Sequence, residues 1–140
     1  MLIANAKELQ DWGESFAHKL LAEKREGALV IQLVGDLGAG KTTLTQGIAR
    51  GLGVSAQITS PTFTVHKEYV SKDKKTELHH FDFYRLPDLG IMKHEMQELA
   101  EDPNNIIVIE WGGILGGLIK TTKTIKIEKL DGEKRALIMD

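Results

Sequence analysis

The stretch GDLGAGKT, residues 35–42, decides the fold that this sequence is expected to adopt. It matches the phosphate-loop pattern GxxxxGK[ST] at every fixed position. Glycines let the backbone wrap closely around phosphate oxygens, and Lys41 would reach the β and γ phosphates of a nucleotide. The Thr42 hydroxyl is a hard oxygen ligand suited to Mg²⁺. The alternative is a glycine-rich turn with a solvated lysine.

The segments on either side favour the phosphate loop over the plain turn. Residues 28–34 form an apolar run without alternation, which is typical of a strand covered on both faces. Leu44, Ile48 and Leu52 recur every fourth residue and predict a helix over 41–52, stopped by Gly53. Strand, loop and helix thus follow in the required order, and the predicted nucleotide-binding residues are Asp36, Leu37, Gly38, Ala39, Gly40, Lys41, Thr42 and Thr43.

The rest of the chain predicts further helices and two hairpins. Residues 5–25 read as an amphipathic helix with a capping box at Asn5 and Glu8, ended by Gly27. Residues 62–70 and 76–83 read as a hairpin, and 125–127 with 136–139 as a second one. A short helix over 89–99 and a buried strand over 106–109 lie between them. The glycines at 112, 113, 116 and 117 suggest a flexible loop.

These elements predict an α/β fold. We expect a three-layer P-loop NTPase domain spanning residues 1–140, with a mixed, mainly parallel central sheet. The strand before the phosphate loop should be central, and the hairpins should lie toward the edges.

Two acidic residues are candidates for the chemistry of the site. Glu110 ends the apolar run IIVIE, where a carboxylate would hold Mg²⁺ directly or through water, although it could merely mark where the strand emerges into solvent. Asp82 lies in an aromatic strand, and both a functional role and a structural pair with Arg85 remain open. Residues 60–62, Ser-Pro-Thr, are either a loop that senses the γ phosphate or an ordinary turn.

The two histidines and the tryptophan beside these acids have simpler interpretations. The neighbouring His79 and His80 should point to opposite faces of a strand, so they cannot form one metal site and are read as core or surface residues. Trp111 could stack on a base or a partner, although packing is its commoner role.

Composition limits the classes of function. With 140 residues, a net charge of −2 and no cysteine, the chain lacks the basic field of a nucleic-acid binder and any thiolate chemistry. No run approaches the roughly twenty apolar residues of a membrane span, so we expect a cytoplasmic protein without membrane attachment. A role on nucleic acid should therefore pass through other proteins.

The motifs GDLGAGKTTL, SPTFTVHKEY, HFDFYRL and IEW, in this order and spacing, resemble the TsaE (YjeE) family. Its members are small bacterial ATPases required for N6-threonylcarbamoyladenosine at position 37 of tRNA, and they act beside TsaD and TsaB. The resemblance implies ATP and Mg²⁺ as cofactors, with tRNA met only through that complex.

By this resemblance, the catalytic residues are Lys41, Asp82 and Glu110, and the magnesium ligands are Thr42 and Glu110. Residues 60–62 would be a mobile switch, and Trp111 would stand beside the metal site. The tail departs from the family pattern, because the expected proline after IEW and a later Leu-Pro are missing. Arg135 of the closing hairpin is predicted to form a wall for the adenine, with the N-terminal edge near Asn5 as a second candidate.

Other functions remain open at this level. A small-molecule kinase would need an acceptor pocket and usually an arginine-bearing lid, but only Arg85 and Arg135 follow the phosphate-loop helix. A GTPase would need an NKxD sequence, which is absent. A switch module that binds nucleotide without cleaving it also remains an alternative.

Overall fold

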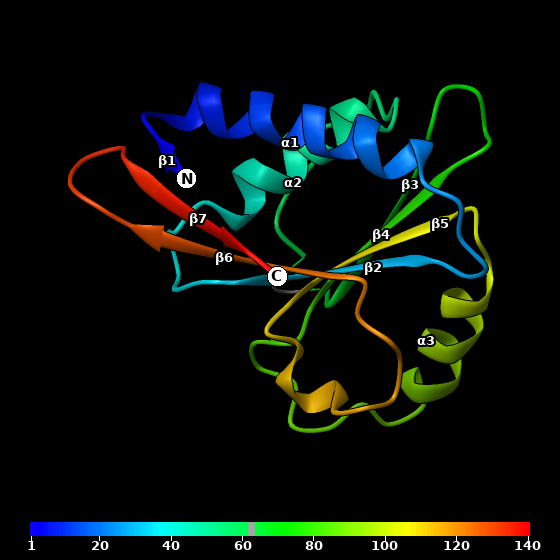
Figure 1. Ribbon diagram of the computed structural model, residues 1–140. Helices are drawn as coiled ribbons and strands as arrows, with labels where there is room; N and C mark the ends of the chain where they lie inside the picture. The colour runs from blue at the N-terminus through cyan, green and yellow to red at the C-terminus, as the bar shows by residue number, and fades with distance from the viewer. Residues whose placement is uncertain (62–63) are drawn as a thin grey trace.

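The computed structural model describes residues 1–61 and 64–140. Its backbone is built around one mixed sheet with helices on both faces (Figure 1). The strands are β1 (Leu2–Ile3), β2 (Leu29–Val34), β3 (His66–Val70), β4 (Glu77–Asp82), β5 (Asn105–Glu110), β6 (Lys123–Lys129) and β7 (Arg135–Met139). The helices are α1 (Ala6–Ala22), α2 (Lys41–Gly51), α3 (Met92–Glu101) and the short 3₁₀ helix η1 (Gly112–Leu115).

The strand order is β1-β7-β6-β2-β5-β4-β3. The four inner strands, β6, β2, β5 and β4, run parallel, whereas the β1–β7, β6–β7 and β3–β4 pairings are antiparallel. The strand before the phosphate loop, β2, is therefore central. The predicted α/β fold, with a mixed sheet and hairpins toward its edges, is confirmed. The two-residue β1 escaped prediction because it is too short to show a hydrophobic period.

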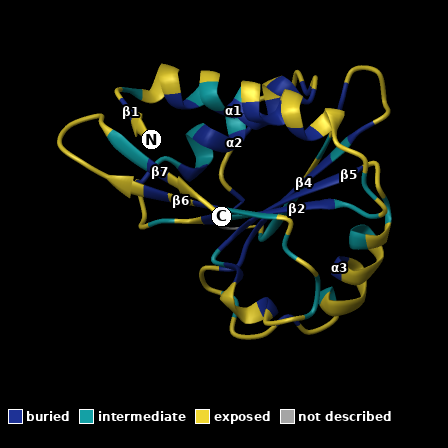
Figure 2. Cartoon of the chain, viewed as in Figure 1, coloured by how far each residue is buried: buried dark blue, intermediate teal, exposed yellow. Residues whose placement is uncertain are grey.

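Helices α1 and α2 cover one face of the sheet and α3 covers the other (Figure 1). Strands β2, β4 and β5 are largely buried between them, while the outer side of α1 and the tip of the β6–β7 hairpin are exposed (Figure 2). Alternate residues of β4 divide between the two apolar layers: Leu78 packs on the α1–α2 side and Phe81 on the α3 side. This alternation decides which side chains of β4 can reach the phosphate loop.

Three glycines allow α1 and α2 to lie against each other. A Cβ atom at Gly47 would stand 2.2 Å from the carbonyl oxygen of Gln10, and one at Gly51 would stand 2.6 Å from that of Glu14. At Gly13 the nearest backbone atom would be the Leu44 carbonyl oxygen, at 2.9 Å. Because a real Cβ atom does not fit at these distances, the helices touch backbone to backbone.

The first helix ends earlier than predicted. Its N-terminus is capped as expected, because the Asn5 side chain accepts a hydrogen bond from the amide of Glu8 at 3.0 Å. It stops at Ala22, since Glu23 adopts an extended conformation and the apolar positions end with Leu20 and Leu21. Gly27 is therefore not its C-cap. A Cβ atom there would lie 2.6 Å from the carbonyl oxygen of Ala100, so this glycine instead permits a close contact with the end of α3.

Other boundaries also shift. The first predicted hairpin strand begins at His66, directly after Val65 with a left-handed φ of 67°, and residues 62–63 lie outside the described part of the chain. The predicted helix over 89–99 runs from Met92 to Glu101. The glycine-rich stretch expected to be a loop contains η1. Among the residues described, no helix is both long and apolar enough to cross a membrane.

Candidate functional site

The phosphate loop lies between the end of β2 and the start of α2. Gly40 is the N-cap of α2 with a φ of 115°, and Gly38 has a φ of 80°, so both adopt backbone conformations that other residues rarely reach. The turn is closed by a hydrogen bond from the Ala39 amide to the Asp36 carbonyl at 3.0 Å. The glycine pattern of the sequence thus has a direct conformational cause.

Lys41 is buried at the base of this loop, with 5% of its surface exposed. Its Nζ donates a hydrogen bond to the Gly35 carbonyl oxygen at 2.7 Å and lies 3.8 Å from Glu110 Oε1. It also stands 4.1 Å from the centre of the Trp111 ring, a cation–π geometry. This placement excludes the solvated lysine that the alternative reading of the motif required.

Burial lowers the pKa of Lys41 from its ordinary value of 10.5. The negative charges of Glu110, Asp82 and Asp36 oppose this shift and favour the protonated form. The three acidic groups thus counteract the effect of burial on the pKa of Lys41.

Asp82 and Glu110 lie side by side because they end two neighbouring parallel strands. They are direct partners in the register of β4 and β5, and each is only 4% exposed. Glu110 Oε2 is 2.6 Å from His80 Nε2, while Asp82 Oδ1 accepts a hydrogen bond from the Tyr84 amide at 2.9 Å. Glu110 therefore does not simply emerge into solvent, which removes the structural alternative for that residue.

The predicted residues meet around one cavity of about 290 Å³. Lys41, Thr42, Asp82 and Glu110 all line it, and Ser60 stands at its rim. Of the predicted switch segment, Thr62 lies outside the described residues. The complete lining is Leu37, Gly38, Gly40, Lys41, Thr42, Thr43, Ser60, Asp82 and Glu110.

Trp111 borders the buried lysine and contacts a second aromatic residue, Tyr84. Trp111 has a left-handed φ of 57° and caps η1, and this conformation turns the chain immediately after Glu110. The rings of Tyr84 and Trp111 are 4.8 Å apart, and the Arg85 guanidinium is 6.0 Å from the Tyr84 ring. Trp111 thus packs on the phosphate-loop lysine as well as on Tyr84, just beyond the end of β4.

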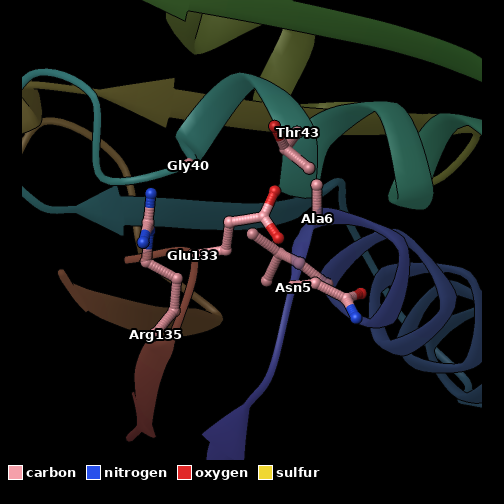
Figure 3. Close-up of a pocket in the computed structure, with 7 residues that line it drawn as sticks. Asn5, Ala6, Gly40, Thr43, Glu133 and Arg135 are labelled. Atoms are coloured by element: carbon pink, nitrogen blue, oxygen red, sulfur yellow. The ribbon is translucent and has the colours of Figure 1, made fainter. Parts of the chain in front are cut away.

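Arg135 lies against the phosphate loop from the closing hairpin. Its Nε donates a hydrogen bond to the Ala39 carbonyl at 2.7 Å, and a second guanidinium nitrogen lies 3.5 Å from the Gly38 carbonyl oxygen. Figure 3 shows Arg135 beside Gly40, with Glu133 directed toward Thr43 and the start of α1. Asn5, Ala6, Leu9, Gly40, Thr43, Glu133 and Arg135 line this smaller pocket of about 90 Å³.

Sequence reasoning assigned no role in the site to His80 or Glu133. A signal for His80 was present, because it precedes Asp82 by two residues in a strand and therefore shares its face. Glu133 follows a turn glycine in a hairpin whose docking onto α1 has no local signature. Asp36, the first variable position of the loop, is exposed, and Leu37 is 65% exposed.

Together these features define a class of fold. A central parallel strand, a glycine loop with a buried lysine at the start of a helix, and carboxylates at the ends of adjacent strands are the framework of the P-loop NTPases.

Comparisons with known proteins narrow this class. The profile of the family described as "Threonylcarbamoyl adenosine biosynthesis protein TsaE" matches residues 3–137. The chain therefore belongs to the TsaE family, whose curated members are named for tRNA threonylcarbamoyladenosine biosynthesis. A Synechocystis TsaE is 43% identical over 103 residues, which cover 71% of this chain and 61% of the relative.

Two further similarities cover more of the chain. A TsaE from Treponema pallidum is 34% identical over 136 residues, which cover 96% of this chain and 95% of the relative. The crystal structure of Bacillus subtilis YdiB superposes with a TM-score of 0.72 at 28% identity, covering 99% of this chain and 81% of that one. By contrast, the chain spans only 61–62% of the length of the Synechocystis and Haemophilus influenzae relatives.

Proposed function

We propose that this chain binds and hydrolyses ATP and thereby serves the formation of N6-threonylcarbamoyladenosine at position 37 of tRNA, together with TsaD and TsaB. The observation that carries the proposal is the buried Lys41 at the base of a glycine loop, in one cavity with Asp82 and Glu110. Families that share a P-loop differ in what they do with a nucleotide, so family membership supports the biological setting and the cavity supports the chemistry.

The loop is suited to a polyphosphate. The first amides of α2 have no carbonyl partner within the helix, and the positive end of its dipole faces the cavity. Lys41 adds a full positive charge in a site from which water is largely excluded, where an anion is bound more strongly than at the surface. These groups would bind and orient the β and γ phosphates.

The cavity also suits Mg²⁺, because its donors are oxygen atoms. The Thr42 hydroxyl and the carboxylates of Glu110 and Asp82 are the hard ligands that this ion prefers. We assign Thr42 and Glu110 as the residues that hold it. When bound, the ion would neutralise charge on the phosphate oxygens during transfer.

The neighbours of the two acids fix their orientation. His80 holds one Glu110 oxygen, so the other is directed toward Lys41 and the cavity. The Tyr84 amide holds Asp82 in the same way. Prearranged carboxylates can position an attacking water without reorganising during the reaction.

The adenine would lie toward the pocket of Figure 3, where Arg135 and the N-terminus of α1 meet. Arg135 already binds the loop carbonyls of Ala39 and Gly38, so it would act first by holding the loop in shape. A role on tRNA would be carried out in the cytoplasm, with the RNA contacted through the partner proteins.

Nucleotide binding is tested by calorimetry with ATP, ADP and GTP in the presence of Mg²⁺. Lys41→Ala should reduce ATP affinity by at least about a hundredfold, since it removes the charge that faces the phosphates. Lys93→Ala is a matched control, because Lys93 is exposed on α3. Equal ATP affinity in Lys41→Ala and the parent chain, both folded by circular dichroism, would refute the assignment.

Hydrolysis is tested by phosphate release, which separates the ATPase from the switch module and the kinase. Glu110→Gln should retain binding but lower turnover by about a hundredfold or more, because the carboxylate charge is lost. Nucleotide that binds but is never cleaved, even with the partner pair present, would favour the switch module. Transfer of the γ phosphate to a small molecule would favour the kinase.

The role with the partners is tested by reconstituting the modification with TsaD, TsaB and tRNA. We propose that ATP turnover by this chain resets the complex between cycles, rather than supplying the chemistry of transfer. Glu110→Gln should then support roughly one round of modification and stall. Many rounds with this variant would contradict the resetting role while leaving nucleotide binding intact.

A further inference from the structure

A second group of metal-binding side chains lies on the β3–β4 hairpin, away from the phosphate loop. His66 and Glu68 of β3 and His79 of β4 each offer one ligand atom, and these three atoms lie within 4.8 Å of one another. His66 Nε2 is 3.1 Å from His79 Nδ1, and each of these nitrogens is 3.8 Å from Glu68 Oε1. Within the residues described, this is the one His, Asp and Glu cluster with such a geometry.

We propose that His66, Glu68 and His79 form a Zn²⁺ site, with solvent as the fourth ligand. Two imidazoles and one carboxylate are a donor set typical of this ion. At Zn–ligand distances of about 2.0–2.2 Å, tetrahedral ligand atoms stand about 3.3–3.5 Å apart. The three separations here lie on either side of that range, so a small side-chain adjustment would complete the geometry.

Charge and hydrogen bonding support the site. Nδ1 of His66 is 3.3 Å from Glu95 Oε1 on α3, an arrangement that leaves the lone pair of Nε2 directed at the cluster. Two lone pairs 3.1 Å apart would repel, so either a proton or a cation must lie between the two histidines. The carboxylates of Glu68 and Glu95 together balance a divalent charge.

The residues around the cluster also favour a defined site over a chance surface grouping. The side chains of His79 and His66 are only 2% and 13% exposed, whereas Glu68 is 58% exposed and gives an ion access from solvent. The His66 ring stacks on Phe81 with centroids 4.1 Å apart, which fixes its orientation.

This site is separate from the magnesium site proposed above. His79 packs on the α3 side of the sheet, while the adjacent His80 points to the opposite side and contacts Glu110. Among the residues that the structure describes, the buried His79 Nε2 has no hydrogen-bond partner, whereas Nδ1 lies 3.1 Å from His66 Nε2. The strand β4, which carries His79, ends at Asp82. The stability of the β3–β4 pair therefore affects the position of the Asp82 carboxylate.

The test is a titration of the purified chain with ZnCl₂ by calorimetry. Excess Mg²⁺ in the buffer would occupy sites built from oxygen alone. We expect one Zn²⁺ per chain. His66→Gln and Glu68→Gln should each weaken binding by about a hundredfold or more, and Glu95→Gln by about tenfold, since it acts through His66. His18→Gln is the matched control, because His18 is exposed on α1, which covers the other face of the sheet.

A second measurement uses the unaltered chain and so does not depend on any variant folding. Long-range nitrogen–proton NMR spectra should show Zn²⁺ bound through Nε2 of His66 and Nδ1 of His79, with the signals of His18 and His94 unchanged. Zn²⁺ bound equally well by His66→Gln, or shifts centred on His80, would place the ion elsewhere and overturn the proposal. Failure of the parent chain to bind Zn²⁺ at micromolar concentration would show that a proton joins the two rings, which also overturns it.

Discussion

The contact between α1 and α2 offers the sharpest test of the fold. Replacing Gly47 with alanine adds one methyl group inside α2, where the Cβ atom would stand 2.2 Å from the Gln10 carbonyl oxygen. This is roughly 1 Å short of the separation at which such atoms normally touch. Because the obstacle is the backbone of Gln10, no side-chain rotation can relieve the clash, and α1 must move away from α2.

Two opposing effects set the size of the change. Alanine at an interior helix position stabilises by about 0.8–1 kcal/mol relative to glycine. Overpacking of a tight interior costs about 1–3 kcal/mol, and a clash between backbone atoms belongs at the upper end of that range. We therefore expect Gly47→Ala to lower the free energy of unfolding by about 1–2 kcal/mol. In a domain of this size, that corresponds to a fall in Tm of about 3–7 °C.

The measurement is urea unfolding followed by circular dichroism, supported by calorimetric Tm values. Gly117→Ala is the matched control, because its added Cβ meets no atom within 4 Å and its φ is not positive. That variant should keep the parent stability to within about 0.5 kcal/mol. If Gly47→Ala proves as stable as the parent, or more so, helix propensity has prevailed and the helices are not in backbone contact.

Three further predictions concern charged residues. Burial lowers the pKa of Lys41 in the folded chain below its ordinary value of 10.5. Between these two pKa values the unfolded chain binds more protons than the folded chain. The free energy of unfolding should therefore rise as pH increases through this window. A Lys41→Met variant, which has no such group, should lack this rise in urea midpoints measured against pH. Arg135→Ala should weaken ATP binding about tenfold by calorimetry, since it removes a guanidinium bond to the Ala39 carbonyl, and unchanged affinity would disprove the bracing role. Arg50→Ala breaks exposed ion pairs to Asp11 and Glu14 and should cost less than about 1 kcal/mol in urea unfolding; a loss above 2 kcal/mol would contradict that estimate.

The parts of the fold that follow from the sequence are those with local causes. The phosphate loop was predictable because Gly38 and Gly40 supply backbone angles that few other residues reach. The inner strands were predictable because burial on both faces leaves a continuous apolar run, as in residues 106–109. Glu110 was placed near the lysine by combining these two patterns.

The parts that did not follow depend on contacts between distant segments. The end of α1 at Ala22 reflects where the helix leaves the core. The prediction that Gly27 ends this helix was wrong, because Gly27 instead permits a close contact with Ala100. His66 and His79 meet only because the hairpin register places them diagonally across two strands. A shift of one residue in that register would move His79 to the other face.

The contact of Arg135 with the loop has a consequence for synthesis on the ribosome. The guanidinium and the carbonyl that it holds are 96 positions apart in the chain. The glycine turn is therefore translated well before the strand that braces it, and a nascent chain should complete this contact only after β7 has left the exit tunnel.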